Sequence, residues 1–280
     1  MIKNIDSPIE RDRLWMDANV VYSRESGWCD HVTDNLHMTV IYHDHPGEKK
    51  LYPCVLWVCG GGWKWVNEEA YLPNLMPLAE AGYVLASVEY QCSNTAQWPV
   101  PLIQLKEAIR FLRKNADRYS IDSNRIGIMG ESSGGHLASL VGTTCGLKEF
   151  EKGENLDESS DVQAVCSWYT PTGLERFEHD PQLGDLIMRF LNGDITKSKE
   201  ADPRTYITEK CPPFLLFHGT KDTLVPIQCS EDLYSALDAK NVPVDYYRIN
   251  GSDHADYPFF QKGIMDIIIN FFDRWLEKAE

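Results

Sequence analysis

Apolar and amphipathic segments alternate along most of the chain. Six short segments are rich in apolar, β-branched or aromatic residues, as expected of strands. They are residues 52–59, 83–90, 126–129, 162–169, 213–217 and 244–249. The first of them is almost continuously apolar, which is typical of a strand in a sheet that is covered on both faces.

Helical spacing of apolar residues lies between and after these strands. A helix is predicted over 71–81, ending at Gly82, and Pro99 and Pro101 open a second one. The apolar stripe of the second helix is Leu102, Leu105, Ile109 and Leu112. A closing helix repeats apolar residues at helical intervals, which places them on one face. These residues are Ile264, Ile267, Ile268, Phe271, Phe272 and Trp275.

Two shorter strands, at 20–23 and 36–43, precede this pattern and predict an antiparallel start. The tripeptide His45-Pro46-Gly47 then predicts a turn. Because strands and helices alternate after this turn, we expect an α/β fold with a mostly parallel sheet of about eight strands and helices on both faces.

The length of 280 residues suits a single domain, residues 1–280, with a large buried core. Residues 172–207 lack a predicted strand and could form a small helical cap. The acidic and polar segment 149–161 is predicted to be a solvated loop.

Composition limits the kinds of molecule that the protein is expected to bind and the compartment in which it is expected to work. The formal net charge is −15, which disfavours nucleic acid and anionic membrane surfaces, since both attract basic patches. No apolar stretch reaches the roughly 20 residues that cross a bilayer. Residues 1–13 are polar and charged and predict no secretory signal. The eight cysteines are scattered without a C-x-x-C pair, so we expect free thiols in a cytoplasmic protein.

The segment Gly130-Glu131-Ser132-Ser133-Gly134 follows the strand at 126–129 and precedes small residues that can open a helix. This G-x-S-x-G pattern between a strand and a helix is typical of a nucleophile elbow, which exposes a serine hydroxyl on a sharp turn. Ser133 is a rival nucleophile, but only Ser132 has glycine two positions away on both sides. An ordinary Gly/Ser turn would give the same pentapeptide, so other residues must decide between a catalytic serine and a simple turn.

A serine nucleophile needs a base, and the base needs an acceptor that orients it. Asp222 and His254 each follow a predicted strand, and both are therefore expected at the carboxyl edge of the sheet. The other seven histidines precede Asp222 in the chain and do not fit the order serine, acid, histidine. His43-Asp44-His45 has a spacing that could bind a metal, but no second ligand pair accompanies it, and we interpret it as part of a turn.

Acyl transfer also needs donors for an oxyanion. The amide of Ser133 follows the predicted nucleophile, and Cys59-Gly60-Gly61-Gly62-Trp63 follows the strand at 52–59. Three glycines allow backbone amides to point at a bound carbonyl. A flexible glycine turn is the alternative.

Together these motifs resemble the esterase/lipase group of the α/β-hydrolase superfamily, in particular the hormone-sensitive-lipase-like carboxylesterases and the feruloyl and acetyl-xylan esterases. The resemblance covers about residues 50–275 and implies a Ser132, Asp222 and His254 triad with Gly61, Gly62 and Ser133 as oxyanion donors. Two positions depart from the family pattern. Cys59 stands where a histidine is usual, and Gln91 follows Tyr90 where relatives usually carry an arginine.

The resemblance implies a serine carboxylesterase that needs no cofactor and no metal. We expect short-chain acyl esters as substrates, with acetyl or feruloyl groups on sugars or xylo-oligosaccharides as the leading class. Trp63, Trp168 and Tyr169 are the predicted substrate contacts, with Trp65 and Trp98 also near the site, and core packing is the alternative for each. Hydrolysis of an aryl formamide or a peptide, and a binding protein without catalysis, remain alternatives. A homo-oligomer is also open.

Overall fold

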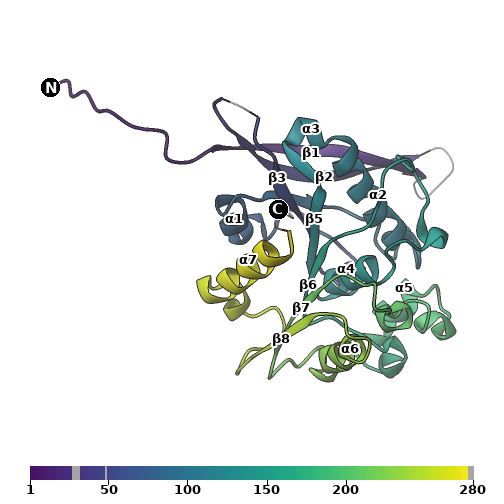
Figure 1. Ribbon diagram of the computed structural model, residues 1–280. Coiled ribbons are helices and arrows are strands. Elements are labelled where there is room, and N and C mark those ends of the chain that lie inside the picture. Colours follow the sequence, from purple (N-terminus) through teal and green to yellow (C-terminus); the bar gives the residue numbers. More distant parts are fainter. Residues whose placement is uncertain (27–31, 48, 277–280) are drawn as a thin grey trace.

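The computed structural model describes residues 1–26, 32–47 and 49–276. Its centre is one sheet of eight strands (Figure 1). The strands are β1 (Arg13–Ser26), β2 (Thr33–Asp44), β3 (Tyr52–Val58), β4 (Val84–Val88), β5 (Ile121–Glu131), β6 (Ala164–Trp168), β7 (Phe214–Gly219) and β8 (Val244–Ile249). Their spatial order is β1-β2-β4-β3-β5-β6-β7-β8. The β1–β2 and β2–β4 pairs are antiparallel and all the others are parallel, so the predicted fold class is confirmed.

The two N-terminal strands are longer than their apolar pattern predicts. β1 has 14 residues and β2 has 12, whereas the pattern marked only 20–23 and 36–43. Backbone pairing holds the extra residues, because each ladder hydrogen bond forms whatever the side chain is. Polar side chains are tolerated there since β1 is an edge strand of the sheet.

Helices flank the sheet on both sides. They are α1 (Leu72–Glu80), α2 (Val100–Lys114), α3 (Ala116–Tyr119), α4 (Ser133–Thr143), α5 (Gly184–Phe190), α6 (Gln228–Asp238) and α7 (Lys262–Leu276). Short 3-10 helices are η1 (Lys148–Phe150), η2 (Leu174–Phe177), η3 (Ile195–Ser198), η4 (Pro203–Tyr206) and η5 (Tyr257–Phe260). The predicted helices α1, α2 and α7 are confirmed. α6 was not predicted, because its buried face is narrow and much of the helix is polar. Segment 172–207, described in full, is helical or irregular and contains no strand.

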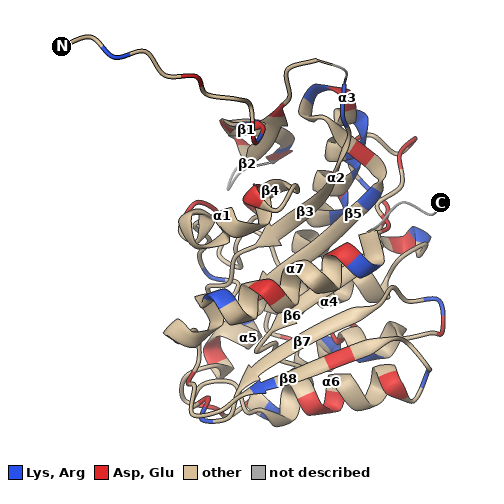
Figure 2. Cartoon of the chain, turned by 60° about the vertical axis from the view of Figure 1, so that its left-hand side comes forward, with Lys and Arg blue, Asp and Glu red and all other residues tan. Residues whose placement is uncertain are grey.

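Two apolar cores lie on the two faces of the sheet. α1 and α7 cover one face, and α2, α4 and α6 cover the other. β3, β6 and β7 contain no charged residue and are tan in Figure 2, whereas the coloured acidic and basic residues lie mainly on helices, loops and edge strands. No helix in the described ranges is both long and apolar enough to cross a bilayer.

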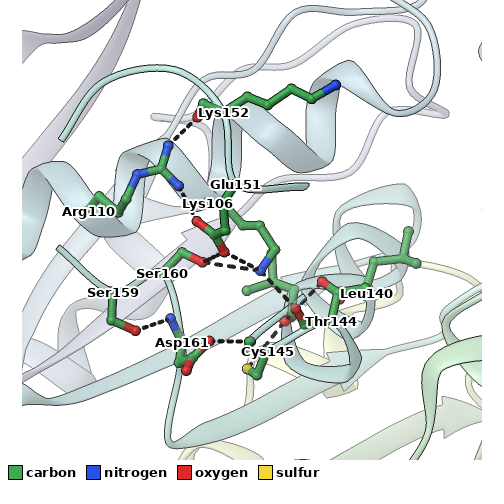
Figure 3. Close-up of polar contacts among 12 residues, drawn as sticks. Lys106, Arg110, Leu140, Thr144, Cys145, Glu151, Lys152, Ser159, Ser160 and Asp161 are labelled. Carbon is green, nitrogen blue, oxygen red and sulfur yellow. Dashed lines mark hydrogen bonds and ion pairs between the residues drawn. The ribbon is translucent and has the colours of Figure 1, made fainter. Parts of the chain in front are cut away.

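Segment 149–161 is a loop, as predicted, and most of it is exposed, but it is not simply solvated because it also pairs with buried cations of α2. The buried cationic side chains are Lys106, Arg110 and Arg113, and this segment supplies partners to each of them. Figure 3 shows the contacts of Lys106 and Arg110. Lys106 Nζ lies 3.1 Å from Glu151 Oε1 and 3.1 Å from Ser160 Oγ. Arg110 Nη1 lies 2.6 Å from Glu151 Oε2. A buried cation must be paired, so the acidic segment is fixed against the helix.

The cysteines and the H-x-H tripeptide have structural surroundings. Seven cysteines lie in the described part of the chain and carry free thiols, and Cys29 lies outside it. His43 lies in β2 rather than in a turn. Its side chain is buried, and its Nε2 donates to the Tyr83 carbonyl oxygen at 3.1 Å. His45 Nδ1 lies 2.5 Å from Asp12 Oδ1. Within the described ranges no group of three or more His, Cys, Asp or Glu residues could hold a metal.

Candidate active site

Ser132 occupies a strained turn between β5 and α4. Its φ and ψ are 54° and −124°, a region that a serine adopts only when the surrounding structure enforces it. The flanking glycines make room for this turn. A Cβ on Gly130 would lie 2.5 Å from the Gly134 carbonyl oxygen, and a Cβ on Gly134 would lie 2.2 Å from the Val58 oxygen. The Ser132 amide donates to the Trp168 carbonyl at 3.0 Å, which ties the turn to β6.

The three residues predicted as a triad meet at the carboxyl edge of the sheet. Ser132 Oγ lies 3.0 Å from His254 Nε2, and His254 Nδ1 lies 2.8 Å from Asp222 Oδ2. A carboxylate can only accept from Nδ1, so the His254 proton sits on Nδ1 and Nε2 is free to accept the serine proton. The hydrogen bonds therefore run in the direction that the predicted triad requires.

Asp222 is held as a carboxylate by several donors. Its side chain is fully buried, and its Oδ1 accepts the amides of Leu224 at 2.9 Å and Val225 at 2.7 Å. His218 Nε2 lies 3.3 Å from Oδ2, on the same oxygen that His254 uses. Burial alone would raise the pKa of Asp222, but the hydrogen bonds from the two imidazoles and from backbone amides hold that pKa well below its ordinary value. The acid of the site is ionised.

The glycine loop after β3 is steadied by Glu131 and Tyr90. The Gly60 amide donates to Glu131 Oε1 at 2.6 Å, and the Tyr90 hydroxyl donates to the Cys59 carbonyl at 3.0 Å. Cys59 Sγ lies 4.0 Å from the same Glu131 oxygen. Burial raises the pKa of the Cys59 thiol to about 12, so this thiol is neutral. With Cys59 in place of the usual histidine, the loop is therefore held by a glutamate from the elbow and by a tyrosine.

Three amides at this point are candidates for binding an oxyanion. The amides of Gly61, Gly62 and Ser133 donate to no acceptor within the described ranges of the chain. Ser133 begins α4, and the first amides of a helix have no acceptor within the helix. Gly61 and Gly62 have φ values of 130° and 63°, which explains the need for glycine. Leu186 of α5 lies against Gly62, where an added Cβ would be 2.8 Å from its Cδ1.

The predicted aromatic contacts are buried. Trp63 is 2% exposed and stacks on Phe190 with ring centroids 4.8 Å apart, and Trp168 is completely buried among core aromatic rings. Trp63 and Trp168 therefore pack in the core, which was the alternative to substrate contact for both of them. Tyr169 is also buried, but its ring contacts the His254 imidazole at 4.5 Å between centroids. Its role in this structure is to pack against the base.

Sequence reasoning missed the positions of Glu131, Tyr90 and His218. A charged residue at the end of an otherwise apolar strand was a signal for Glu131, since a buried carboxyl needs a donor. His218 ends a buried strand, but chain order removed it as a candidate base and gave no sign of its contact with Asp222. Gln91 is the second departure from the family pattern. Its backbone N–H donates to Gln104 Oε1 at 2.9 Å, and Gln104 Nε2 donates to Gln91 Oε1 at 2.7 Å.

A mostly parallel eight-stranded sheet with a serine elbow after β5, an acid after β7 and a histidine after β8 defines the α/β-hydrolase fold. The predicted resemblance to esterases of this fold is confirmed by comparison with known proteins. The sequence profile of the BD-FAE family matches residues 40–237, and the chain belongs to this family.

Three relatives illustrate the similarity. Esterase LipQ of Mycobacterium tuberculosis is 31% identical over 224 residues, which cover 75% of this chain and 51% of LipQ. The chain thus spans about half the length of that relative. A solved structure titled as a truncated carbohydrate esterase from gut microbiota has a TM-score of 0.81, 25% identity, and coverage of 94% of this chain and 97% of its own. An acetyl ester-xyloside bifunctional hydrolase from Caldicellulosiruptor lactoaceticus has a TM-score of 0.74 and 25% identity, with coverage of 86% and 88%.

Proposed function

We propose that the protein is a serine carboxylesterase that hydrolyses short-chain acyl esters of sugars, with acetyl groups on xylo-oligosaccharides as the leading substrate. The observation that carries this proposal is the continuous hydrogen-bonded chain from Ser132 through His254 to Asp222, beside amides that lack an acceptor. Names of similar proteins support the substrate class, because two solved structures of similar fold are titled as a carbohydrate esterase and an acetyl ester-xyloside hydrolase.

In the proposed reaction, Ser132 Oγ attacks the ester carbonyl carbon while His254 Nε2 takes the hydroxyl proton. Asp222 accepts from Nδ1 and stabilises the imidazolium that forms. The amides of Gly61, Gly62 and Ser133 bind the oxyanion of the tetrahedral intermediate. When this intermediate collapses, the carbon–oxygen bond to the alcohol breaks and His254 returns its proton to the leaving alcohol. An acyl-serine remains.

A water molecule then enters the space that the alcohol has left. His254 removes a proton from this water as it attacks the acyl-serine. It returns this proton to Ser132 Oγ as the second intermediate collapses to the carboxylic acid and free Ser132. All proton transfers use one imidazole, so the chain's own residues complete the cycle. Residues 172–207, which contain Leu186 beside Gly62, are proposed to act as a small cap over the acyl side of the site.

The test is a comparison of Ser132→Ala with Ser133→Ala on p-nitrophenyl acetate. Loss of the nucleophile is expected to lower kcat by several powers of ten. Ser133→Ala keeps the backbone amide and is expected to cost far less. A fluorophosphonate probe followed by peptide mass spectrometry should label Ser132. Equal activity of wild type and a folded Ser132→Ala variant, or absence of both turnover and labelling in wild type, would reject the esterase assignment.

A further inference from the structure

The structure separates the aromatic residues near the site into buried and exposed ones. Trp63, Trp98, Trp168 and Tyr169 are buried, whereas Trp65 is 58% exposed. Trp65 lies one turn beyond the predicted oxyanion donor Gly61, and its amide lies 3.4 Å from the Gly61 carbonyl oxygen. A large apolar ring held in water beside a reaction centre is available to a ligand.

Trp65 borders a groove of about 570 Å³, which is within the size range of small-molecule sites. Three segments wall the groove: the start of β2, the end of β4 with the loop after it, and the loop after β3. They are braced together by hydrogen bonds. The Glu89 amide donates to the His37 carbonyl at 2.9 Å, and the Ser93 amide donates to the Trp63 carbonyl at 2.6 Å. The groove is thus formed before any ligand binds, which lowers the entropic cost of binding.

The groove lies to one side of the nucleophile. Ser132 follows β5, while the groove is over the ends of β3, β4 and β2, in the spatial order β5-β3-β4-β2. Strands lie about 4.8 Å apart, so the end of β4 is roughly 10 Å from the end of β5. A two-carbon acyl group bound at Ser132 cannot span this distance. An occupant of the groove must belong to a larger part of the substrate.

Polar side chains dominate the remaining lining of the groove. Charged or hydrogen-bonding groups come from Asp34, His37, Lys64, Glu89 and Asn94. Charges of both signs are present, and the His37 imidazole lies 3.2 Å from Glu89. Fatty acyl chains or apolar alcohols would remove water from these groups without offering new hydrogen bonds, at a cost in free energy. A ligand with many hydroxyl groups can both donate to carboxylates and accept from lysine.

We propose that this Trp65 groove is a carbohydrate subsite, which binds a sugar residue next to the one that carries the ester. The indole ring would stack on the apolar C–H face of a sugar ring, while the surrounding side chains bond to its hydroxyl groups. The inference rests on the proposed esterase function and adds to it the place where a neighbouring sugar residue of the oligosaccharide binds.

The test compares Trp65→Ala, Trp65→Phe and Trp275→Ala on two substrates, p-nitrophenyl acetate and acetylated xylo-oligosaccharides. Trp275 is the matched control, because it is also an exposed tryptophan. It lies at the end of α7, and the neighbouring Leu276 carbonyl accepts from Arg125 in the first half of β5. Ser132 follows the other end of that strand. Trp65→Ala is expected to lower kcat/KM for the oligosaccharide about tenfold more than for the aryl ester, mainly through KM. Trp65→Phe should recover part of this loss, and Trp275→Ala should match wild type.

Binding can be measured without turnover. In the Ser132→Ala background, isothermal titration with deacetylated xylo-oligosaccharides should show an affinity that Trp65→Ala weakens by a similar factor. If Trp65→Ala lowers kcat/KM by the same factor for p-nitrophenyl acetate and for the oligosaccharide, the subsite proposal is overturned. Wild-type protein without activity on either substrate would instead reject the esterase function, so the two failures are distinguishable.

Discussion

Glu131→Ala tests whether the glutamate inside the elbow pentapeptide positions the oxyanion loop. The side chain is buried, and its Oε1 accepts the Gly60 amide at 2.6 Å. Alanine removes this acceptor and leaves a buried amide without a partner next to the two glycines that are proposed to bind the oxyanion. Ser132, His254 and Asp222 keep their own hydrogen bonds.

The size of the effect follows from the cost of a lost buried hydrogen bond. An unsatisfied buried donor costs about 1–3 kcal/mol. If this cost is expressed in the transition state, kcat falls roughly 5- to 150-fold, since about 1.4 kcal/mol corresponds to a factor of ten. Complete loss of one oxyanion donor costs about 100- to 1,000-fold, which is an upper limit for a loop that is displaced but present. KM should change little, because the oxyanion forms only after substrate binds.

The assay is steady-state hydrolysis of p-nitrophenyl acetate together with urea unfolding. Glu107 of α2 offers a matched control, since it is a buried glutamate whose Oε1 accepts the Glu154 amide at 3.1 Å, away from Ser132. Glu107→Ala is expected to lower the free energy of unfolding without lowering kcat. Glu131→Gln keeps an oxygen acceptor and should restore most of kcat. If Glu131→Ala has the kcat of wild type, or if Glu107→Ala loses as much, the positioning role is refuted.

The same carboxyl predicts a dependence of stability on pH. Burial raises the pKa of Glu131 in the folded protein, and the Gly60 hydrogen bond opposes this. Between the ordinary glutamate pKa and the raised one, the folded state binds a proton that the unfolded state does not. Stability from this group is therefore greatest below the ordinary value and is lost as the pH rises through the raised pKa. The unfolding free energy of wild type minus that of Glu131→Gln should fall across this window, and a flat difference would contradict the shift.

Asp222→Asn should lower kcat about 10,000-fold, because the amide reverses the histidine tautomer. Its stability relative to wild type should depend on pH: the lowered pKa of Asp222 stabilises the wild type above the ordinary aspartate pKa, and urea unfolding should show this advantage fading as the pH falls toward the lowered value. Glu151→Gln leaves Lys106 and Arg110 buried without their carboxylate and should destabilise the fold by about 3–5 kcal/mol. Asp157→Asn removes only an exposed ion pair and should lower the unfolding free energy far less by the same measurement, so equal losses would contradict this account.

Strand and helix patterns predicted most of the sheet and helices α1, α2 and α7, which include the two longest of the described helices. The apolar run located β3 well because a strand inside a covered sheet must be apolar for its whole length. The bounds of β8 were also predicted, although this strand lies at the other edge of the sheet and contains Asp245 and Arg248. The same rule gave poor bounds for β1 and β2, where polar residues are paired through the backbone at the edge of the sheet. The order of Ser132, Asp222 and His254 along the chain predicted that they would meet, since parallel strands bring their carboxyl ends to one edge.

Local chemistry in the sequence determined which residues could act as nucleophile, acid and base, because turn glycines and chain order are local or topological properties. Only the tertiary structure decided what surrounds them. Glu131 accepts the amide of Gly60, His218 contacts Asp222, and the acidic segment 149–161 pairs with buried cations. The tertiary structure also leaves the Trp65 side chain exposed, although it buries that of Trp63 two residues earlier. The reason is physical: burial and partner choice depend on segments distant in sequence, and no local pattern specifies which of them will meet.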